Sequence, residues 1–193
     1  MQSLPLILFI SLNTIVWLLT LLKQYRTEYF YFFVLLNVMD IVTLAGWMSF
    51  DFSSNVIMFF ITTLILLSIL PNIYKNAKRR HIYVAAALLI TAVFHFFDLS
   101  HTTLWGIMIL CVVIILIITR RIIVTSTYQG ILNLMHLLLL FYYLTVVFKL
   151  FNTISGVDMG VFYFWFFQVM HLLTGLAFCF VNVNTKHFEI KLG

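Results

Sequence analysis

Charged residues are scarce in this sequence. Only 9% of its 193 residues are charged and 64% are hydrophobic, whereas a soluble domain carries roughly a quarter charged residues. A water-soluble fold of this length leaves much of its surface exposed and could not hide so many apolar side chains. The composition therefore excludes an ordinary soluble domain. It predicts one all-α domain, residues 1–193, that is integral to a lipid bilayer.

Cysteine, proline and glycine are also rare, with two, two and seven residues. Cys111 and Cys179 fall in different apolar segments at different depths, so we expect two buried thiols and no disulfide, which needs Cα atoms within about 7 Å. Pro71 falls in the last turn of its segment, where a missing backbone donor is tolerated. The few glycines and prolines supply no matched pair of broken helices, the feature that marks the substrate site of many transporters.

Catalytic and nucleotide-binding motifs are absent from the sequence. It contains no HExxH, no close cysteine pair, no GxSxG and no Walker pattern. Its last apolar segment has no lysine to form a retinal Schiff base. The N-terminus lacks the features of a signal peptide, so the first apolar segment is expected to remain as a helix. We expect a protein that is not an enzyme and has no cofactor.

The main feature that is present is a series of long apolar runs separated by short polar breaks. A membrane-spanning helix needs about 20 apolar residues at 1.5 Å each. This measure predicts a bundle of seven transmembrane helices, at residues 4–22, 30–50, 56–74, 82–99, 104–119, 131–151 and 161–183. Residues 122–130 are predicted as an interfacial turn, and residues 184–193 as a short tail.

Basic residues predict the orientation of this bundle. With seven spans, Lys149 alone among the 11 lysines and arginines falls toward one side, and the others fall on the opposite side. The positive-inside rule then places the N-terminus outside and the C-terminus in the cytoplasm. We predict residence in the plasma membrane, which in a bacterium is the inner membrane. The basic clusters lie between spans, as is typical of membrane orientation rather than nucleic-acid binding.

Aromatic residues make up 18% of the chain, including 21 phenylalanines. We expect most of the phenylalanines to face lipid or to pack between helices. Trp47, Trp105 and Trp165 fall near the outer ends of predicted spans, and Trp17 falls toward an inner end. All four are predicted to anchor the protein at the membrane interfaces.

Several polar side chains lie inside the predicted spans and are the candidate functional residues. Such groups cost about 2.5–3.5 kcal/mol near the bilayer centre and usually face the bundle interior. Counting 1.5 Å per residue from the cytoplasmic end of each span places six of them in one layer, at roughly 14–24 Å. They are Asn13, Asp40, His95, Asp98, Gln168 and His171. His136 lies nearer the inner interface, at roughly 8 Å.

Asp40 is the most costly of these groups. It stands three residues from Asn37 and three from Thr43, so the three share one stripe of a helix. One interpretation is a protonated acid that is hydrogen-bonded to a neighbouring helix and joins the two helices. The other is a proton or cation site.

A second stripe is formed by His95, Asp98 and His101. One interpretation is a core histidine followed by two residues in the wet headgroup region. The other is a metal site, to which His171 could add a ligand. His95 and His171 could also hold a b-type haem, but bulky phenylalanines beside them argue against it. We predict no metal, and these four residues stay the metal candidates.

Three function classes are compatible with this pattern. The leading one is a non-enzymatic membrane module, either sensor-like or a membrane subunit of a larger complex, because loops are short and no catalytic constellation is present. Its expected partners are the lipid bilayer and other membrane or cytoplasmic proteins, and not nucleic acid. The alternative is a small transporter or proton or cation conduit around Asp40 and His171. An intramembrane metal- or haem-dependent enzyme has the least support.

Overall fold

The computed structural model describes residues 4–48, 54–70, 77–97, 100–157, 160–181 and 189–191. Within these ranges the chain forms seven α-helices and two short strands. The helices are α1 (Leu4–Lys23), α2 (Phe30–Met48), α3 (Ser54–Ile69), α5 (Ala77–Phe96), α6 (Ser100–Gln129), α7 (Leu134–Ser155) and α8 (Gly160–Phe180). The strands are β1 (Ile131–Asn133) and β2 (Glu189–Lys191). Pro71 and Asp98 lie outside the described residues.

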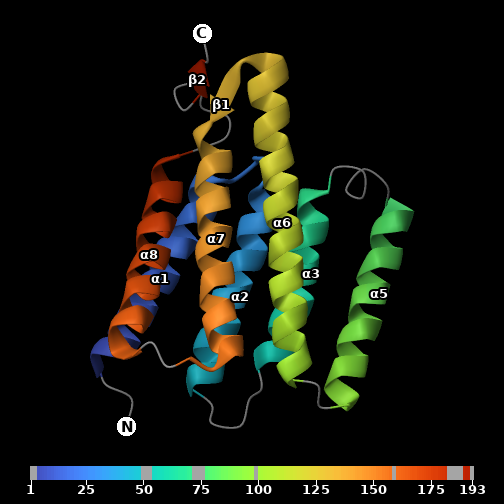
Figure 1. Cartoon of the computed structure of the whole chain (residues 1–193), viewed down its shortest axis with the longest axis vertical. Coiled ribbons are helices and arrows are strands. Elements are labelled where there is room, and N and C mark those ends of the chain that lie inside the picture. Colours follow the sequence, from blue (N-terminus) through green and yellow to red (C-terminus); the bar gives the residue numbers. More distant parts are fainter. Residues whose placement is uncertain are drawn as a thin grey trace.

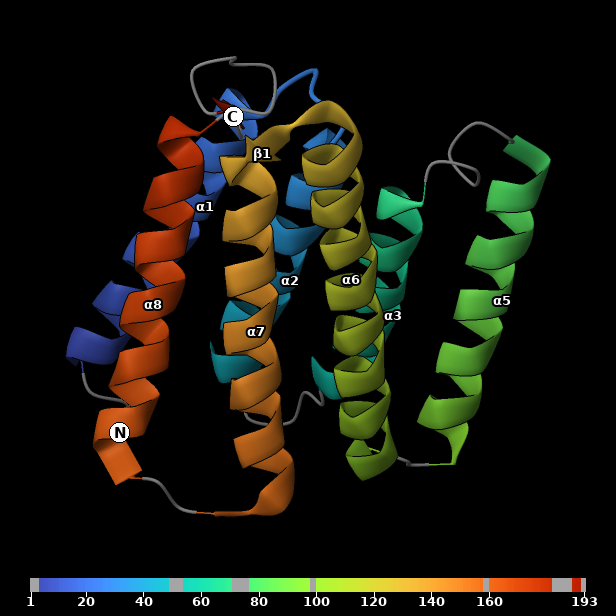
Figure 2. The ribbon, with the colours of Figure 1, turned by 45° about the horizontal axis from the view of Figure 1, so that its top comes forward.

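The helices stand side by side and run alternately in opposite directions (Figures 1 and 2). Helices α1 and α8 pack together at one edge, and α2, α3, α6 and α7 form the middle. Helix α5 stands at the other edge, where it packs mainly against α3. The predicted all-helical class is confirmed, and the two short strands are an addition to it.

Three helices are long and apolar enough to cross a membrane: Thr102–Gln129, Leu134–Ser155 and Phe162–Phe180. Four shorter apolar stretches cover Leu8–Lys23, Phe30–Ala45, Asn55–Ile69 and His81–Phe96. Large apolar side chains also lie on the outer surface of the helices, as a membrane environment favours. The protein is therefore a helical protein that associates with a membrane.

Helix α6 is longer than predicted. It has 30 residues, or about 45 Å at 1.5 Å per residue, and it includes the segment that the sequence predicts as an interfacial turn. That prediction is wrong because Thr125 and Ser126 turn their hydroxyls back onto carbonyls three or four residues earlier in the helix. The helix ends instead at Gln129, and the next residue, Gly130, takes a φ of +62°.

Helix α7 begins three residues later than predicted, after β1. The side chain of Asn133 accepts a hydrogen bond from the Met135 amide at 2.9 Å and caps the helix. At the other end Gly156 adopts a φ of +65°, a left-handed conformation that favours glycine. Strand β1 pairs antiparallel with β2, and Leu132 lies opposite Ile190. Part of the predicted tail therefore returns to the bundle.

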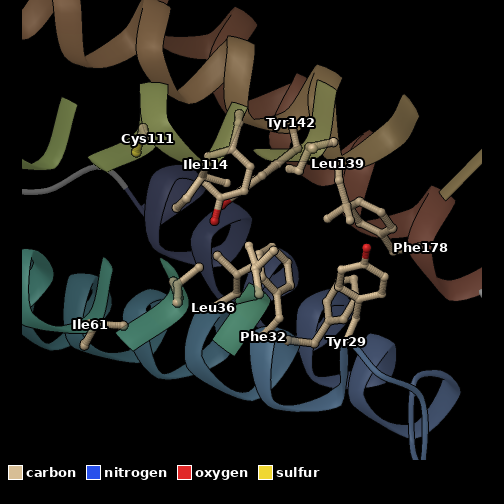
Figure 3. Packing of buried hydrophobic residues seen from close by; sticks show 14 of the residues in the cluster. Tyr29, Phe32, Leu36, Ile61, Cys111, Ile114, Leu139, Tyr142 and Phe178 are labelled. Atoms are coloured by element: carbon tan, nitrogen blue, oxygen red, sulfur yellow. The ribbon is translucent and has the colours of Figure 1, made fainter. Parts of the chain in front are cut away.

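The interior is rich in aromatic side chains (Figure 3). Trp17 is fully buried and contacts the rings of Phe33, Tyr142 and Phe178, at centroid distances of 6.4, 5.3 and 5.9 Å. The prediction of an interfacial anchor at Trp17 is therefore wrong. The helix turn that carries Trp17 faces α8, and a depth count along one helix does not show which face points inward.

Gly175 makes room for this indole. A Cβ atom at position 175 would lie 3.0 Å from Trp17 Nε1 and 3.1 Å from Val16 Cγ1. Small residues of this kind let two membrane helices approach closely, because between them packing rather than water exclusion drives association. The glycine inside α8 thus brings α1 and α8 together.

Candidate functional site

Asp40 and His171 form the only side-chain acid–base contact between two helices in the part of the chain that the structure describes. His171 Nε2 on α8 lies 3.4 Å from Asp40 Oδ2 on α2. The distance exceeds the usual range of a hydrogen bond, so the contact is a loose one. The side chains are 16% exposed for Asp40 and 21% for His171. The polar groups therefore lie mostly inside the bundle, where charge is costly.

Aromatic rings enclose His171. Its imidazole stacks at a tilt on Trp17, with centroids 4.8 Å apart and planes at 31°. Tyr142 of α7 lies on another side at 5.5 Å. A protonated imidazole in this position would face both the Asp40 carboxylate and the electron-rich face of an indole. The interaction energy of His171 with Asp40 and Trp17 therefore depends on whether its imidazole is protonated.

Lys149 is a basic residue that interacts with Asp40. It lies on α7, its side chain is exposed, and it interacts electrostatically with Asp40. Asp40 of α2 therefore contacts a histidine of α8 and interacts electrostatically with a lysine of α7.

The other predicted site residues do not take part in the Asp40–His171 contact. Asn13 on α1 is 7% exposed, and its Oδ1 has no hydrogen-bond partner among the described residues. Gln168 is half-buried on α8, one turn before His171. His95 is exposed on α5, where its ring contacts Phe96. Because α5 and α8 lie at opposite edges of the bundle (Figure 2), the structure does not bring His95 to His171. A haem held between these two histidines does not fit this geometry.

The predicted metal stripe can be followed only in part. Asp98 lies outside the described residues, and of His101 the structure describes only its backbone in the first turn of α6. Within the described ranges, no group of three or more His, Cys, Asp or Glu side chains is close enough together to hold a metal ion.

A second polar network at the opposite end of α7 was not predicted. The Arg121 guanidinium donates to Tyr29 Oη at 2.6 Å and also to the carbonyl of Ile69. Tyr29 Oη lies 2.8 Å from His136 Nε2. The network therefore joins the end of α3 and the start of α2 to α6 and α7. Its members are far apart in sequence, so no local spacing indicates it.

The hydrogen bonds of Tyr29 indicate where the protons of Tyr29 and His136 lie. Burial raises the pKa of Tyr29 to about 12, although the neighbouring Arg121 charge opposes the rise. The hydroxyl therefore keeps its proton, and it can accept from Arg121 while donating to His136. His136 Nδ1 then carries the ring proton, and in the described part of the chain it has no partner.

Gln24 supports the same end of the bundle. Its Nε2 donates to the carbonyls of Phe178 and Val181, at 3.2 and 2.6 Å. These carbonyls belong to the C-terminal end of α8, where backbone acceptors lack helical partners. A side chain that follows α1 thus caps α8.

Comparison with other proteins adds no further site. No protein-family model, curated protein or solved structure matches this chain. The chemistry of the site must therefore be inferred from its own groups. A carboxylate and an imidazole in contact can share, take up or release a proton.

Proposed function

We propose that this chain is a non-enzymatic, seven-span integral membrane protein in which the Asp40–His171 contact is a proton-responsive junction between α2 and α8. The module acts as a sensor, or as the membrane subunit of a larger complex that reads the junction. The observation that carries the proposal is the 3.4 Å contact of an acid and a base from two helices, in a region where ionisable groups are seldom kept without a role.

The proposed topology has the N-terminus outside and the C-terminus cytoplasmic, in the plasma membrane. It is supported by the alternating directions of the helices and by the position of their basic residues (Figure 1). Lys23 ends α1, and Arg120 and Arg121 follow the apolar part of α6, at the same end of the bundle. Residues 78–80 begin α5 at that same end, and Lys149 lies toward the other.

The electrostatic energy between Asp40 and a protonated His171 is large enough to shift the arrangement of α2 and α8. Two unit charges about 4 Å apart interact by about 1 kcal/mol in water and about 4 kcal/mol at an effective dielectric constant of 20. Because each 1.4 kcal/mol changes an equilibrium tenfold, these energies let protonation of His171 shift the equilibrium between two arrangements of α2 and α8 by roughly one to three orders of magnitude. This shift between the two arrangements requires protonation of His171 alone.

Trp17 offers a direct measurement, since a protonated imidazole quenches a stacked indole. We expect tryptophan emission of the full chain in detergent micelles to fall as His171 becomes protonated. The change should disappear in His171→Gln and in Trp17→Phe. It should persist in His95→Gln, which removes an exposed histidine at the other edge.

Thermal unfolding of each variant establishes that it is folded before its titration is compared. A flat emission curve in the folded wild-type protein would contradict the junction. The same holds for a titration that survives in folded His171→Gln.

A second candidate is a proton or cation conduit. The observation that favours it is that Asp40 of α2 contacts His171 of α8 and interacts electrostatically with Lys149 of α7, so that ionisable groups of three helices influence one another. The packing of His171 against the rings of Trp17 and Tyr142 favours the sensor instead, because a conduit needs an open polar path. Proton and cation flux into liposomes separates the two. Flux that Asp40→Asn abolishes would establish the conduit, and a wild-type protein without flux would exclude it.

A further inference from the structure

A cavity of about 40 Å³ lies inside the bundle between α2, α3, α6 and α7. A volume of about 10–15 Å³ already holds a water molecule, and protein interiors contain few voids larger than that. The side chains of Leu36, Cys111 and Tyr142 line it and are at most 2% exposed. Leu36 extends into the interior from one side, and Cys111 and Tyr142 from the other (Figure 3). The cavity is therefore part of the core.

The surface that faces the cavity is apolar. Thr62 belongs to the lining, but its hydroxyl donates to the Met58 carbonyl at 2.7 Å within α3. A stable buried water needs two to four polar partners, so water is a poor occupant. An ion would be poorer still, because the described residues present no polar group there to replace its hydration. Apolar cavities in protein cores stay dry and take up uncharged molecules such as xenon.

Tyr142 is a wall of this cavity and also of the Asp40–His171 contact. Its ring centroid lies 5.5 Å from that of the His171 imidazole and 5.3 Å from that of the Trp17 indole. On α2, Met39 lines the cavity and is followed directly by Asp40. Because side chains in a core are close-packed, a change on one side of a shared ring is felt by its neighbours on the other.

We propose that the cavity binds a small, uncharged apolar molecule of one or two heavy atoms, such as dioxygen, and that Tyr142 transmits its presence to the Asp40–His171 junction. The volume is about three times the smallest that holds a water molecule, which suits an occupant of this size. The binding site stands on the cavity itself, whereas the coupling rests on the proposed function.

The bilayer supplies such a molecule. Apolar solutes concentrate in hydrocarbon, so in the proposed membrane setting the molecule reaches the bundle without a polar path. At the affinity ceiling for one or two heavy atoms, the dissociation constant is about millimolar or weaker. Coupling is reciprocal, so a molecule that binds one arrangement of α2 and α8 better also moves the proton equilibrium of the junction.

The test of binding uses xenon as the probe and isotope-labelled methionine methyl groups as reporters. NMR spectra of the full chain in detergent micelles are recorded under xenon pressure, with the same pressure of helium as the reference. We expect a saturable shift of the methyl signals of Met39 and Met58, which line the cavity. Met108 packs against the core without lining the cavity. Its signal should move no more under xenon than under helium.

Cavity-filling variants locate the bound xenon. Val146→Leu adds a methylene group at a lining position and should remove most of the xenon-induced shift. Val147→Leu is the matched control, because the next residue of α7 packs against the core but does not line the cavity. It should leave the shift unchanged. If Val146→Leu does not fold, Cys111→Val fills the cavity from α6 and serves in its place.

The coupling is measured through the tryptophan emission of the junction. Xenon should move the pH midpoint of the emission change in the wild type and in Val147→Leu, but not in Val146→Leu. An unmoved midpoint in a wild-type protein that binds xenon would overturn the transmission through Tyr142.

Two results would overturn the binding site. They are methyl signals that respond no more to xenon than to helium, and a xenon-induced shift that persists in the folded cavity-filling variants. An emission curve that is flat with pH would contradict the proposed function and the coupling, while the methyl shifts decide the binding site separately.

Discussion

The hydroxyl of Tyr29 lies 2.6 Å from a guanidinium nitrogen of Arg121 and 2.8 Å from His136 Nε2. One phenol thus serves as the meeting point of an arginine of α6 and a histidine of α7, just before α2 begins. Arg121 also holds the carbonyl of Ile69 at the end of α3. Four helices are therefore tied together at the end of the bundle where most basic residues gather.

Tyr29→Phe should destabilise the protein by about 1–2 kcal/mol. The ring would stay, but an Arg121 N–H group and the His136 ring nitrogen would each lose a partner in a buried place. The measurement is thermal unfolding in detergent. Tyr25→Phe is the control, since that side chain is 60% exposed and its hydroxyl should matter little. Equal loss in both variants would mean that the network contributes nothing of its own.

Alkaline pH should weaken the fold through the same phenol. Burial raises the pKa of Tyr29 from 10.0 to about 12, so the unfolded chain loses this proton first. The contribution of Tyr29 is complete below pH 10 and is lost as the pH rises toward about 12. The difference in unfolding free energy between wild type and Tyr29→Phe should shrink across that window. A constant difference would contradict the raised pKa.

Gly175→Ala should separate α1 from α8. The added methyl group would lie 3.0 Å from Trp17 Nε1, and overpacking of this kind costs about 1–3 kcal/mol. Trp17→Phe in the same chain should recover part of the loss, because the smaller ring leaves room at that position. Strictly additive effects of the two substitutions would show that they do not touch.

Asn133→Ala should cost about 1 kcal/mol by removing the cap of α7. Asn133→Asp keeps a side-chain acceptor for the Met135 amide and should cost much less. Unfolding curves of the two variants, compared at one pH, check this expectation. If both lose the same stability, the role of Asn133 lies in the β1–β2 pairing and not in the cap.

Labelling with a membrane-impermeant maleimide tests the orientation. Ser155→Cys lies at the far end of α7 and should react in intact cells. Tyr128→Cys, at a position that is 83% exposed near the end of α6, should react only after permeabilisation. The reverse pattern would invert the orientation. Reaction of both from one side would mean that α7 does not cross the membrane. The wild-type chain supplies the background from its two native cysteines.

The sequence predicts the seven helices seen in the described residues and, for most of them, their approximate ends, because apolar runs and polar breaks are local features. Its errors fall where the decisive contact is not local. Thr125 and Ser126 were expected to interrupt a helix, but their hydroxyls return to the backbone of the same helix and let α6 continue. The pairing of β1 with β2 joins segments more than 50 residues apart, and no pattern within either strand indicates it.

The same distinction applies to the candidate site. Counting depth along each helix placed Asp40 and His171 within a few Å of each other in height, and they are in contact. The same count placed His95 in that layer, although it is exposed on α5, at the opposite edge of the bundle from α8. Depth is a property of one helix, whereas the neighbour that a side chain faces depends on how helices are arranged around the bundle axis.

The sequence by itself determined that the chain is helical, that its helices are apolar, and which polar groups they carry at which height. It could do so because composition and periodicity act within a single helix. Only the tertiary structure decided that Trp17 lies inside, that Tyr29 joins Arg121 to His136, and that Met39, Met58 and Cys111 line one cavity. Those relations depend on the rotation and neighbours of each helix, which are set by packing among distant side chains.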